Sequence, residues 1–222
     1  MKKWMLMLCL LLFFDIQIIG SMRDKTSLDT FRQAGMPVKW FQKAGVETEE
    51  MEQYLEFWED LKYFPVAGRL EDAGEVFSFQ DTWHEARNYG GERMHEGCDV
   101  FGRYDRREYY PVVSMTEGVV ETVGWLPLGG WRIGIRSPGG GFFYYAHLSS
   151  YERQFQAGDV VKAGEILGFL GDTGYGEEGT RGKFPCHLHV GIYVKTQKEA
   201  EHALNPYPVL LFLESRQKNF FY

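Results

Sequence analysis

The chain has 222 residues, which is enough for one domain of good size and an extension. Aromatic residues make up 16% of it and glycines number 26, a composition typical of a strand-rich protein with many tight turns. The formal net charge is −7 and no basic face is apparent, which argues against nucleic acid as a partner.

The first twenty residues differ from the rest. Two lysines precede an apolar run from Trp4 to Phe14, which is short for a full membrane span and typical of the apolar core of a signal peptide. A weak cleavage signal ends at Gly20. The alternative is an uncleaved anchor that keeps the lysines in the cytoplasm. We predict that residues 1–20 are a signal peptide or signal anchor and that the protein is exported.

Residues 21–76 read as a helical extension. A short helix is expected from Ser27 to Gln33, and a longer one opens at Thr48 with acidic residues in its first turn, where the helix dipole favours them. The extension could be a stalk, a docking surface, a latency segment or a small helical unit packed on the next domain. Apolar residues at helical spacing support the longer helix: Met51, Tyr54, Leu55, Trp58 and Leu61.

From Phe77 the pattern changes to short strands separated by glycine turns. Residues 138–141 predict a hairpin turn. Residues 171–185 form a long glycine-rich loop, a candidate cleft wall that lacks the phosphate-loop pattern. These features predict a mainly antiparallel β fold for residues 77–222, with strands around Val112–Val113, Gly118–Val123, Trp131–Ile135, Gly141–Ala146 and Ile166–Phe169.

The histidines carry the chemistry. His95 and Asp99 form an HxxxD pattern, and His187 and His189 form an HxH pattern about ninety residues later. In a strand, residues two apart point to the same face, so both rings of the HxH pair can enter one cleft. Two imidazoles and a carboxylate around one metal, with a fourth position open, is the layout of a catalytic zinc site. His147 ends a third, aromatic segment, while His84 and His202 read as surface or packing residues.

These segments, in this order, resemble the lysostaphin-type zinc peptidases, also called the LytM or peptidoglycan endopeptidase family. The resemblance runs from about Phe77 to Tyr207 and implies an antiparallel β-sandwich of the duplicated hybrid motif, or barrel-sandwich, type. The motifs that carry it are Arg93–Val100, Val113–Val120, Tyr145–Leu148, Gly158–Gly168, Gly171–Gly174, His187–His189 and Asn205–Pro206.

The resemblance also implies roles for five residues. His95, Asp99 and His189 would hold one Zn²⁺ per chain, and no other cofactor is expected. His147 and His187 would be the unligated catalytic pair. One of the pair would act as general base towards a water molecule, and the other would stabilise the oxyanion or protonate the leaving amine. Their assignment to these two roles stays open.

The implied function is hydrolysis of peptide bonds in bacterial peptidoglycan, in the stem or the cross-bridge, by an enzyme that is secreted, in the cell wall, or anchored to the outer face of the cell membrane. One alternative is a non-catalytic cell-wall, sporulation or division partner that uses the domain for binding. Another is a carrier or phosphotransfer module, against which Asp99 argues. The bond cut, the oligomeric state and a protein activator stay open. Cys98 and Cys186, next to the site, could be disulfide-bonded or two small buried residues.

Overall fold

The computed structural model describes residues 28–70, 77–88, 91–196 and 199–220. The chain divides between Leu55 and Glu56 into two compact units. The predicted signal peptide or anchor of residues 1–20 lies outside the described residues. Within the described ranges, no helix combines the length and the apolar character needed to span a bilayer.

The first unit is helical. Residues 28–33 form a helix, followed by α2 (Val38–Lys43) and α3 (Thr48–Leu55). Both helices predicted in this region are therefore present. The longer one ends at Leu55, earlier than the apolar spacing indicated, and a separate 3₁₀ turn, η1 (Trp58–Asp60), follows it.

The helix of residues 28–33 and α2 end in the same way. Gly35 and Gly45 adopt φ of +73° and +74°, the left-handed conformation that glycine enters without steric cost. The backbone N–H of the residue after each glycine donates to the carbonyl five positions back, at 2.9 and 3.0 Å. These bonds satisfy carbonyls that a helix end leaves without partners, so each glycine produces a compact stop.

The second unit begins with residues that lie upstream of the predicted strand-rich region. Phe57, Trp58 and Phe64 are at most 4% exposed. The Phe57 ring meets Phe143 edge to face, with 5.3 Å between the ring centroids. Part of the segment predicted as an extension thus belongs to the core of the β-rich unit. The predicted boundary at residues 76 and 77 stays a prediction.

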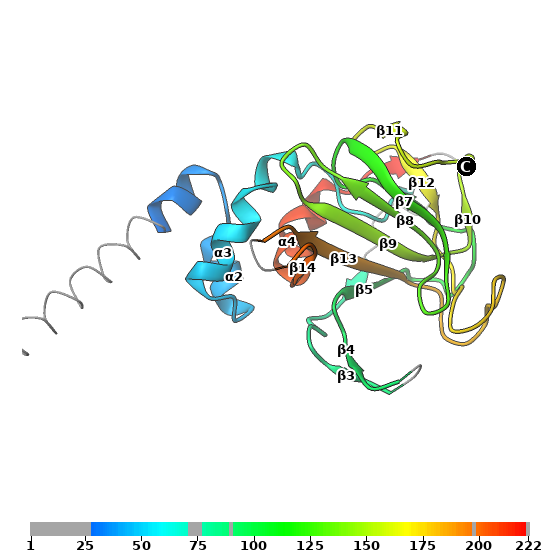
Figure 1. Cartoon of the computed structure of the whole chain (residues 1–222). Coiled ribbons are helices and arrows are strands. Elements are labelled where there is room, and N and C mark those ends of the chain that lie inside the picture. Colours follow the sequence, from blue (N-terminus) through cyan, green and yellow to red (C-terminus); the bar gives the residue numbers. More distant parts are fainter. Residues whose placement is uncertain (1–27, 71–76, 89–90, 197–198, 221–222) are drawn as a thin grey trace, which may run out of the picture. The chain divides into compact units, whose positions relative to one another are not determined.

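The β-rich unit is built around one antiparallel sheet with the strand order β11-β7-β8-β9-β13-β5-β2, in which β14 also pairs with β13 (Figure 1). The buried positions of β9 and β13 fill the core beneath it. The strands are β2 (Ser78–Phe79), β5 (Cys98–Phe101), β7 (Gly118–Leu126), β8 (Gly130–Arg136), β9 (Phe142–Leu148), β11 (Val160–Val161), β13 (Leu188–Val194) and β14 (His202–Leu204).

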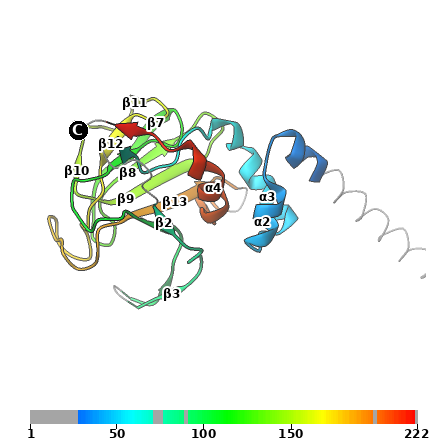
Figure 2. The same cartoon turned by 180° about the vertical axis from the view of Figure 1, so that it is seen from behind.

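Smaller elements complete this unit. Figure 2, the view from behind, shows α4 in front of the main sheet. The smaller elements are the sheet of β10 (Ser150–Tyr151), β12 (Ile166–Phe169) and β6 (Pro111–Val113), the parallel pair β1 (Gly68–Arg69) and β15 (Asn219–Phe220), the hairpin of β3 (Ala86–Arg87) and β4 (Arg93–Met94), and the helices α4 (Tyr207–Leu213) and η2 (Glu214–Arg216).

The predicted mainly antiparallel β fold with short N-terminal helices is confirmed. The five predicted strands correspond to β6, β7, β8, β9 and β12. The predicted turn joins β8 to β9, where the Ser137 N–H donates to the Gly141 carbonyl at 2.9 Å. One detail differs: β13 begins at Leu188, so His187 lies just before the strand and is held by a single bridge to Gly171.

Candidate functional site

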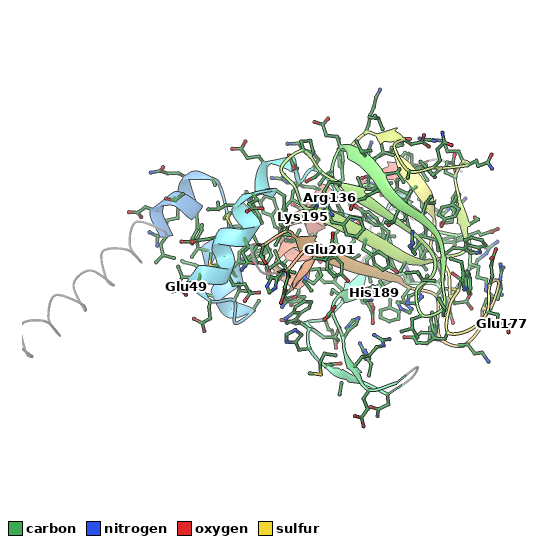
Figure 3. All side chains as sticks on the ribbon, in the orientation of Figure 1. Glu49, Arg136, Glu177, His189, Lys195 and Glu201 are labelled. Carbon is green, nitrogen blue, oxygen red and sulfur yellow. The ribbon has the colours of Figure 1, made fainter. Side chains whose placement is uncertain are left out.

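The pairing of β13 with β5 creates the centre of the site. In this antiparallel pair His189 lies directly opposite Asp99. Opposed side chains in such a ladder have Cβ atoms about 4.5–5.5 Å apart, so the register alone brings an imidazole and a carboxylate together. The His189 Nδ1 atom is 3.1 Å from Asp99 Oδ1. Figure 3 labels His189 on β13, on the side of the sheet from which the β3–β4 hairpin extends.

His95, which directly follows β4, completes a triangle of donor atoms. Its Nε2 atom is 3.0 Å from His189 Nδ1 and 3.2 Å from Asp99 Oδ1. Ligands about 2.0–2.1 Å from a tetrahedral zinc ion are about 3.3 Å apart. The three measured edges are close to this value, and two nitrogens with one carboxylate oxygen are donors that zinc prefers. The geometry and the chemistry of this group therefore fit a zinc ion.

The far side of the His95 ring is held in place. Its Nδ1 atom lies 3.2 Å from the Thr82 carbonyl oxygen and 3.0 Å from the Thr82 hydroxyl. The Arg87 Nη2 atom, which can only donate, lies 3.0 Å from the same Nδ1 atom. The carbonyl favours a proton on Nδ1 and the guanidinium disfavours it, so these contacts fix the position of the ring but not its tautomer. The Nε2 atom faces Asp99 and His189, which is the ring orientation that a metal ligand requires.

Gly97 allows His189 to approach. A Cβ atom at position 97 would collide with the Cε1 and Nε2 atoms of the His189 ring. Gly97, the middle residue between His95 and Asp99, therefore leaves room for the His189 imidazole. The spacing of the HxxxD pattern works because a residue without a side chain occupies this position.

His147 lies at an irregularity in the pairing of β8 with β9. The register shifts there: Trp131 pairs with Leu148, but Ile133 pairs with Tyr145. His147 takes φ of +63°, unusual for a residue with a side chain, and such strain is often found at functional sites. Its Nδ1 atom donates to the Thr173 carbonyl at 2.8 Å.

His187 has a similar orientation. Its Nδ1 atom donates to the Pro185 carbonyl at 2.8 Å, and its Nε2 atom lies 3.8 Å from Asp99 Oδ1. The rings of His187 and His147 are 4.8 Å apart between centroids. Because a carbonyl binds Nδ1 in both residues, the Nε2 lone pair of each is free to accept a proton.

Burial sets the charge states in the site. Burial lowers the pKa of His147 and of His187, and neighbouring imidazoles lower the pKa of His147 further. Both rings are therefore neutral at physiological pH. For Asp99, burial favours the neutral acid, but hydrogen bonds with His189 and His95 outweigh it and hold the pKa of the carboxyl well below its usual range.

The five predicted site residues line one cavity of about 150 Å³. Its walls include residues that the sequence analysis did not identify. The β3–β4 hairpin contributes Arg87 and Arg93, and the glycine-rich loop contributes Tyr175, as expected of a cleft wall. Arg93 could have been found, because in an extended segment it shares a face with His95, two positions on.

The glycine-rich loop is fastened at its start. Asp172, with a side chain only 5% exposed, receives two hydrogen bonds from Arg107, at 2.6 and 2.7 Å. The Gly182 N–H donates to the same carboxylate at 2.9 Å. The next residue, Thr173, donates its hydroxyl to the Leu148 carbonyl at 2.7 Å, so the segment that holds His147 is itself held.

The other cysteines and histidines considered in the sequence analysis lie outside the group of His95, Asp99 and His189. Cys98 and Cys186 are free and buried, as the simpler of the two sequence interpretations expects. Burial raises the pKa of Cys186 to about 12, which keeps it a neutral thiol. His84 is exposed and stacks on Trp83. His202 is 37% exposed and pairs with Glu199 at 2.7 Å, so both histidines are surface residues.

Comparisons with known proteins identify relatives of this chain. The chain is 45% identical over 161 residues to the L-Ala--D-Glu endopeptidase of Bacillus subtilis (strain 168), covering 68% of this chain and 48% of that protein. It is 39% identical over 84 residues to lysostaphin of Staphylococcus simulans, covering 37% and 16% respectively. The chain thus spans about half the length of the Bacillus relative, and less of lysostaphin.

A solved structure extends the similarity to the fold. It is the crystal structure of a protein from Ruminococcus gnavus ATCC 29149 described as a glycyl-glycine endopeptidase, lytM. The two are 48% identical with a TM-score of 0.69, over 82% of this chain and 73% of that one. The resemblance to lysostaphin-type peptidases is confirmed. Residues 93–206 match the model of Peptidase family M23, and the chain belongs to that family.

Proposed function

We propose that the protein is an exported zinc metalloendopeptidase that hydrolyses peptide bonds of bacterial peptidoglycan. The observation that carries the proposal is the convergence of His95, Asp99 and His189 in one cavity with His147 and His187 beside them. Export rests on the N-terminal sequence alone. The peptidoglycan substrate rests on the relatives, one of which is named for the bond between L-Ala and D-Glu.

In this proposal His95, Asp99 and His189 hold the metal. When bound, zinc supplies Lewis acidity: it polarises the scissile carbonyl and lowers the pKa of a coordinated water towards about 7. The carboxylate and two neutral imidazoles leave a net positive charge at the site, which suits stabilisation of a developing oxyanion. Burial of the group strengthens these interactions because little water screens them.

His147 and His187 handle protons. Each has its Nδ1 proton engaged by a backbone carbonyl and its Nε2 lone pair available, which is the state required of a general base. In this state one ring can accept a proton from the attacking water at Nε2 and become an imidazolium, which can then pass that proton to the departing amine. The complete set of five side chains favours an enzyme over the non-catalytic binding partner.

The proposal is tested by digesting purified peptidoglycan with zinc-loaded protein, with and without a chelator, and identifying the fragments by mass spectrometry. We expect new amine ends that the chelator abolishes and added zinc restores. The mass of the fragments identifies the bond. Intact peptidoglycan after treatment with protein that carries one zinc per chain would contradict the proposed activity.

A further inference from the structure

The charge of the cleft differs from the charge of the whole chain. The chain carries a net charge of −7. Two cavities adjoin here: the metal-site cavity and one of about 280 Å³. Apart from histidines, the charged residues among those that line them are three cations and one carboxylate: Arg87, Arg93, Lys183 and Asp99. In the proposed function the carboxylate is committed to the metal. The lining is therefore suited to an anionic group on the substrate.

The two arginines are not equivalent. The Arg87 Nη2 atom lies 3.4 Å from Asp99 Oδ2, and its Nη1 atom lies 3.7 Å from Glu85. Its Nη2 atom also lies 3.0 Å from His95 Nδ1. Arg87 is thus engaged by the metal-site residues and by Glu85. It supports the metal site more than it offers charge to the cleft.

Arg93 has no such carboxylate. Among the described residues, no acidic side chain lies within ion-pairing distance of it. Its Nη2 atom donates to the Tyr175 hydroxyl at 2.9 Å, across the cleft from the β3–β4 hairpin to the glycine-rich loop. Its buried Nε atom has no hydrogen-bond partner in the described part of the chain. A half-buried guanidinium is costly unless a negative group balances its charge.

We propose that Arg93 binds a free carboxylate of the substrate, next to the bond that is cut. This inference rests on the proposed function and specifies its substrate class: an acidic stem peptide rather than an uncharged glycine bridge. A glutamate within a peptide uses one carboxyl group in the chain and leaves the second ionised. The planar guanidinium matches that group with two parallel N–H donors.

Tyr175 supports this specificity residue. It adopts φ of +56°, and its ring stacks on His147 with 5.9 Å between centroids. Its hydroxyl occupies one Arg93 donor and so orients the guanidinium towards the cavity. Because Tyr175 contacts both Arg93 and His147, a carboxylate held by Arg93 lies close to the group that moves protons.

The test removes the Arg93 charge from the enzyme and the carboxylate charge from the substrate, separately and together. Full-chain, zinc-loaded protein is assayed on a peptide with an L-Ala–D-Glu bond, blocked at both ends, and on its twin with the free carboxylate converted to a carboxamide. We expect the conversion to lower kcat/KM roughly 10- to 100-fold, the range of a hydrogen bond to a charged group. In Arg93→Gln we expect kcat/KM for the carboxylate peptide to fall by a similar factor, so that the two peptides have nearly equal kcat/KM.

Three variants separate recognition from folding. Arg103→Gln removes the same charge at an exposed position outside the two cavities and leaves the preference unchanged. Arg93→Lys keeps the charge but lacks the two parallel N–H donors, so it retains part of the preference for the carboxylate peptide. Tyr175→Phe removes only the hydroxyl. If Arg93→Gln lowers kcat/KM equally for both peptides, as a structural role would, the inference is overturned.

Binding measurements keep this inference separate from the proposed function. Calorimetry of the two peptides with wild-type protein and Arg93→Gln needs no turnover. If neither peptide is cut but wild-type protein binds the carboxylate form at least tenfold more tightly, and Arg93→Gln does not, the recognition stands and the proposed reaction fails. Equal binding of both peptides by wild-type protein overturns the inference, whatever the protein cleaves.

Discussion

At the residue scale, the five side chains of the candidate site fall into a metal-binding group and a proton-transfer pair, and one substitution in each distinguishes their roles. Asp99→Ala removes the carboxylate ligand from the triangle and the Asp99 contact of Arg87, so we expect the purified variant to lose its zinc. His147→Ala leaves the triangle intact, so we expect one zinc per chain and a fall in kcat of roughly 10²- to 10⁴-fold, the usual contribution of a general acid or base.

Metal analysis of the two purified variants, beside kcat on peptidoglycan, measures both effects. Thermal denaturation of each variant checks that the fold is kept. A zinc-free but folded His147→Ala protein would show that His147 belongs to the metal-binding group and would reverse its assignment.

The convergence of the five candidate side chains in one cavity could be predicted from the sequence because a few spacings place them. The HxH pair needs only the two-residue period of an extended chain, and family order supplied the rest. The contacts that orient these rings could not be predicted. The Thr82 carbonyl contacts His95, and the Thr173 carbonyl contacts His147, across 13 and 26 positions of the chain. No local pattern marks a carbonyl that lies this far away.

At the scale of the element, the glycine-rich loop depends on one carboxylate. In Asp172→Asn the amide keeps one acceptor oxygen but loses the charge and presents N–H groups to the Arg107 and Gly182 donors. We expect a loss of about 1.5–3 kcal/mol of unfolding free energy, the value of a hydrogen bond to a charged group. We also expect a lower kcat/KM, because the loop orients His147 and carries Tyr175.

Denaturant unfolding and peptide hydrolysis measure the two effects of Asp172→Asn. Asp159→Asn is the matched control, since it weakens a more exposed ion pair with Arg153, away from the cleft. Unchanged stability in Asp172→Asn, with the control also unchanged, would mean that the loop is held by its other contacts.

Strands were easier to predict than the elements around the cleft. The strands of the main sheet carry apolar residues between glycine turns, and this pattern is local. The β3–β4 hairpin consists of two strands of two residues each, and none of the four residues is buried. The sequence there therefore shows no alternation of apolar and polar residues. The longer helix ended before its apolar spacing did. Trp58 and Leu61 are buried in the β-rich unit and not on a helix face, a consequence of tertiary packing.

At the scale of the whole molecule, the unit boundary between Leu55 and Glu56 predicts where the chain can be shortened. A chain of residues 56–222 keeps Phe57, Trp58 and Phe64, so we expect it to fold and to show a cooperative thermal transition. A chain of residues 77–222 loses all three. Removal of a buried aromatic side chain costs about 3–5 kcal/mol. The sum is comparable with the entire stability of a domain, about 5–15 kcal/mol, so we expect it not to fold.

Circular dichroism and thermal scans of the two shortened chains, with the full chain as the reference, test this expectation. A stable, cooperative fold for residues 77–222 would return the boundary to the position predicted from the sequence. Peptide hydrolysis by residues 56–222 shows in addition whether the helical unit modulates access to the cleft.

The register that sets His189 opposite Asp99 joins positions ninety residues apart in the chain. In the unfolded polypeptide these groups are too distant to act together, so the candidate zinc site exists only in the finished sheet. Zinc that binds only the folded state stabilises it by mass action. A nascent or translocating chain would therefore carry no hydrolytic capacity. If the proposed function holds, the cell that makes this protein is protected from its activity until the chain has folded.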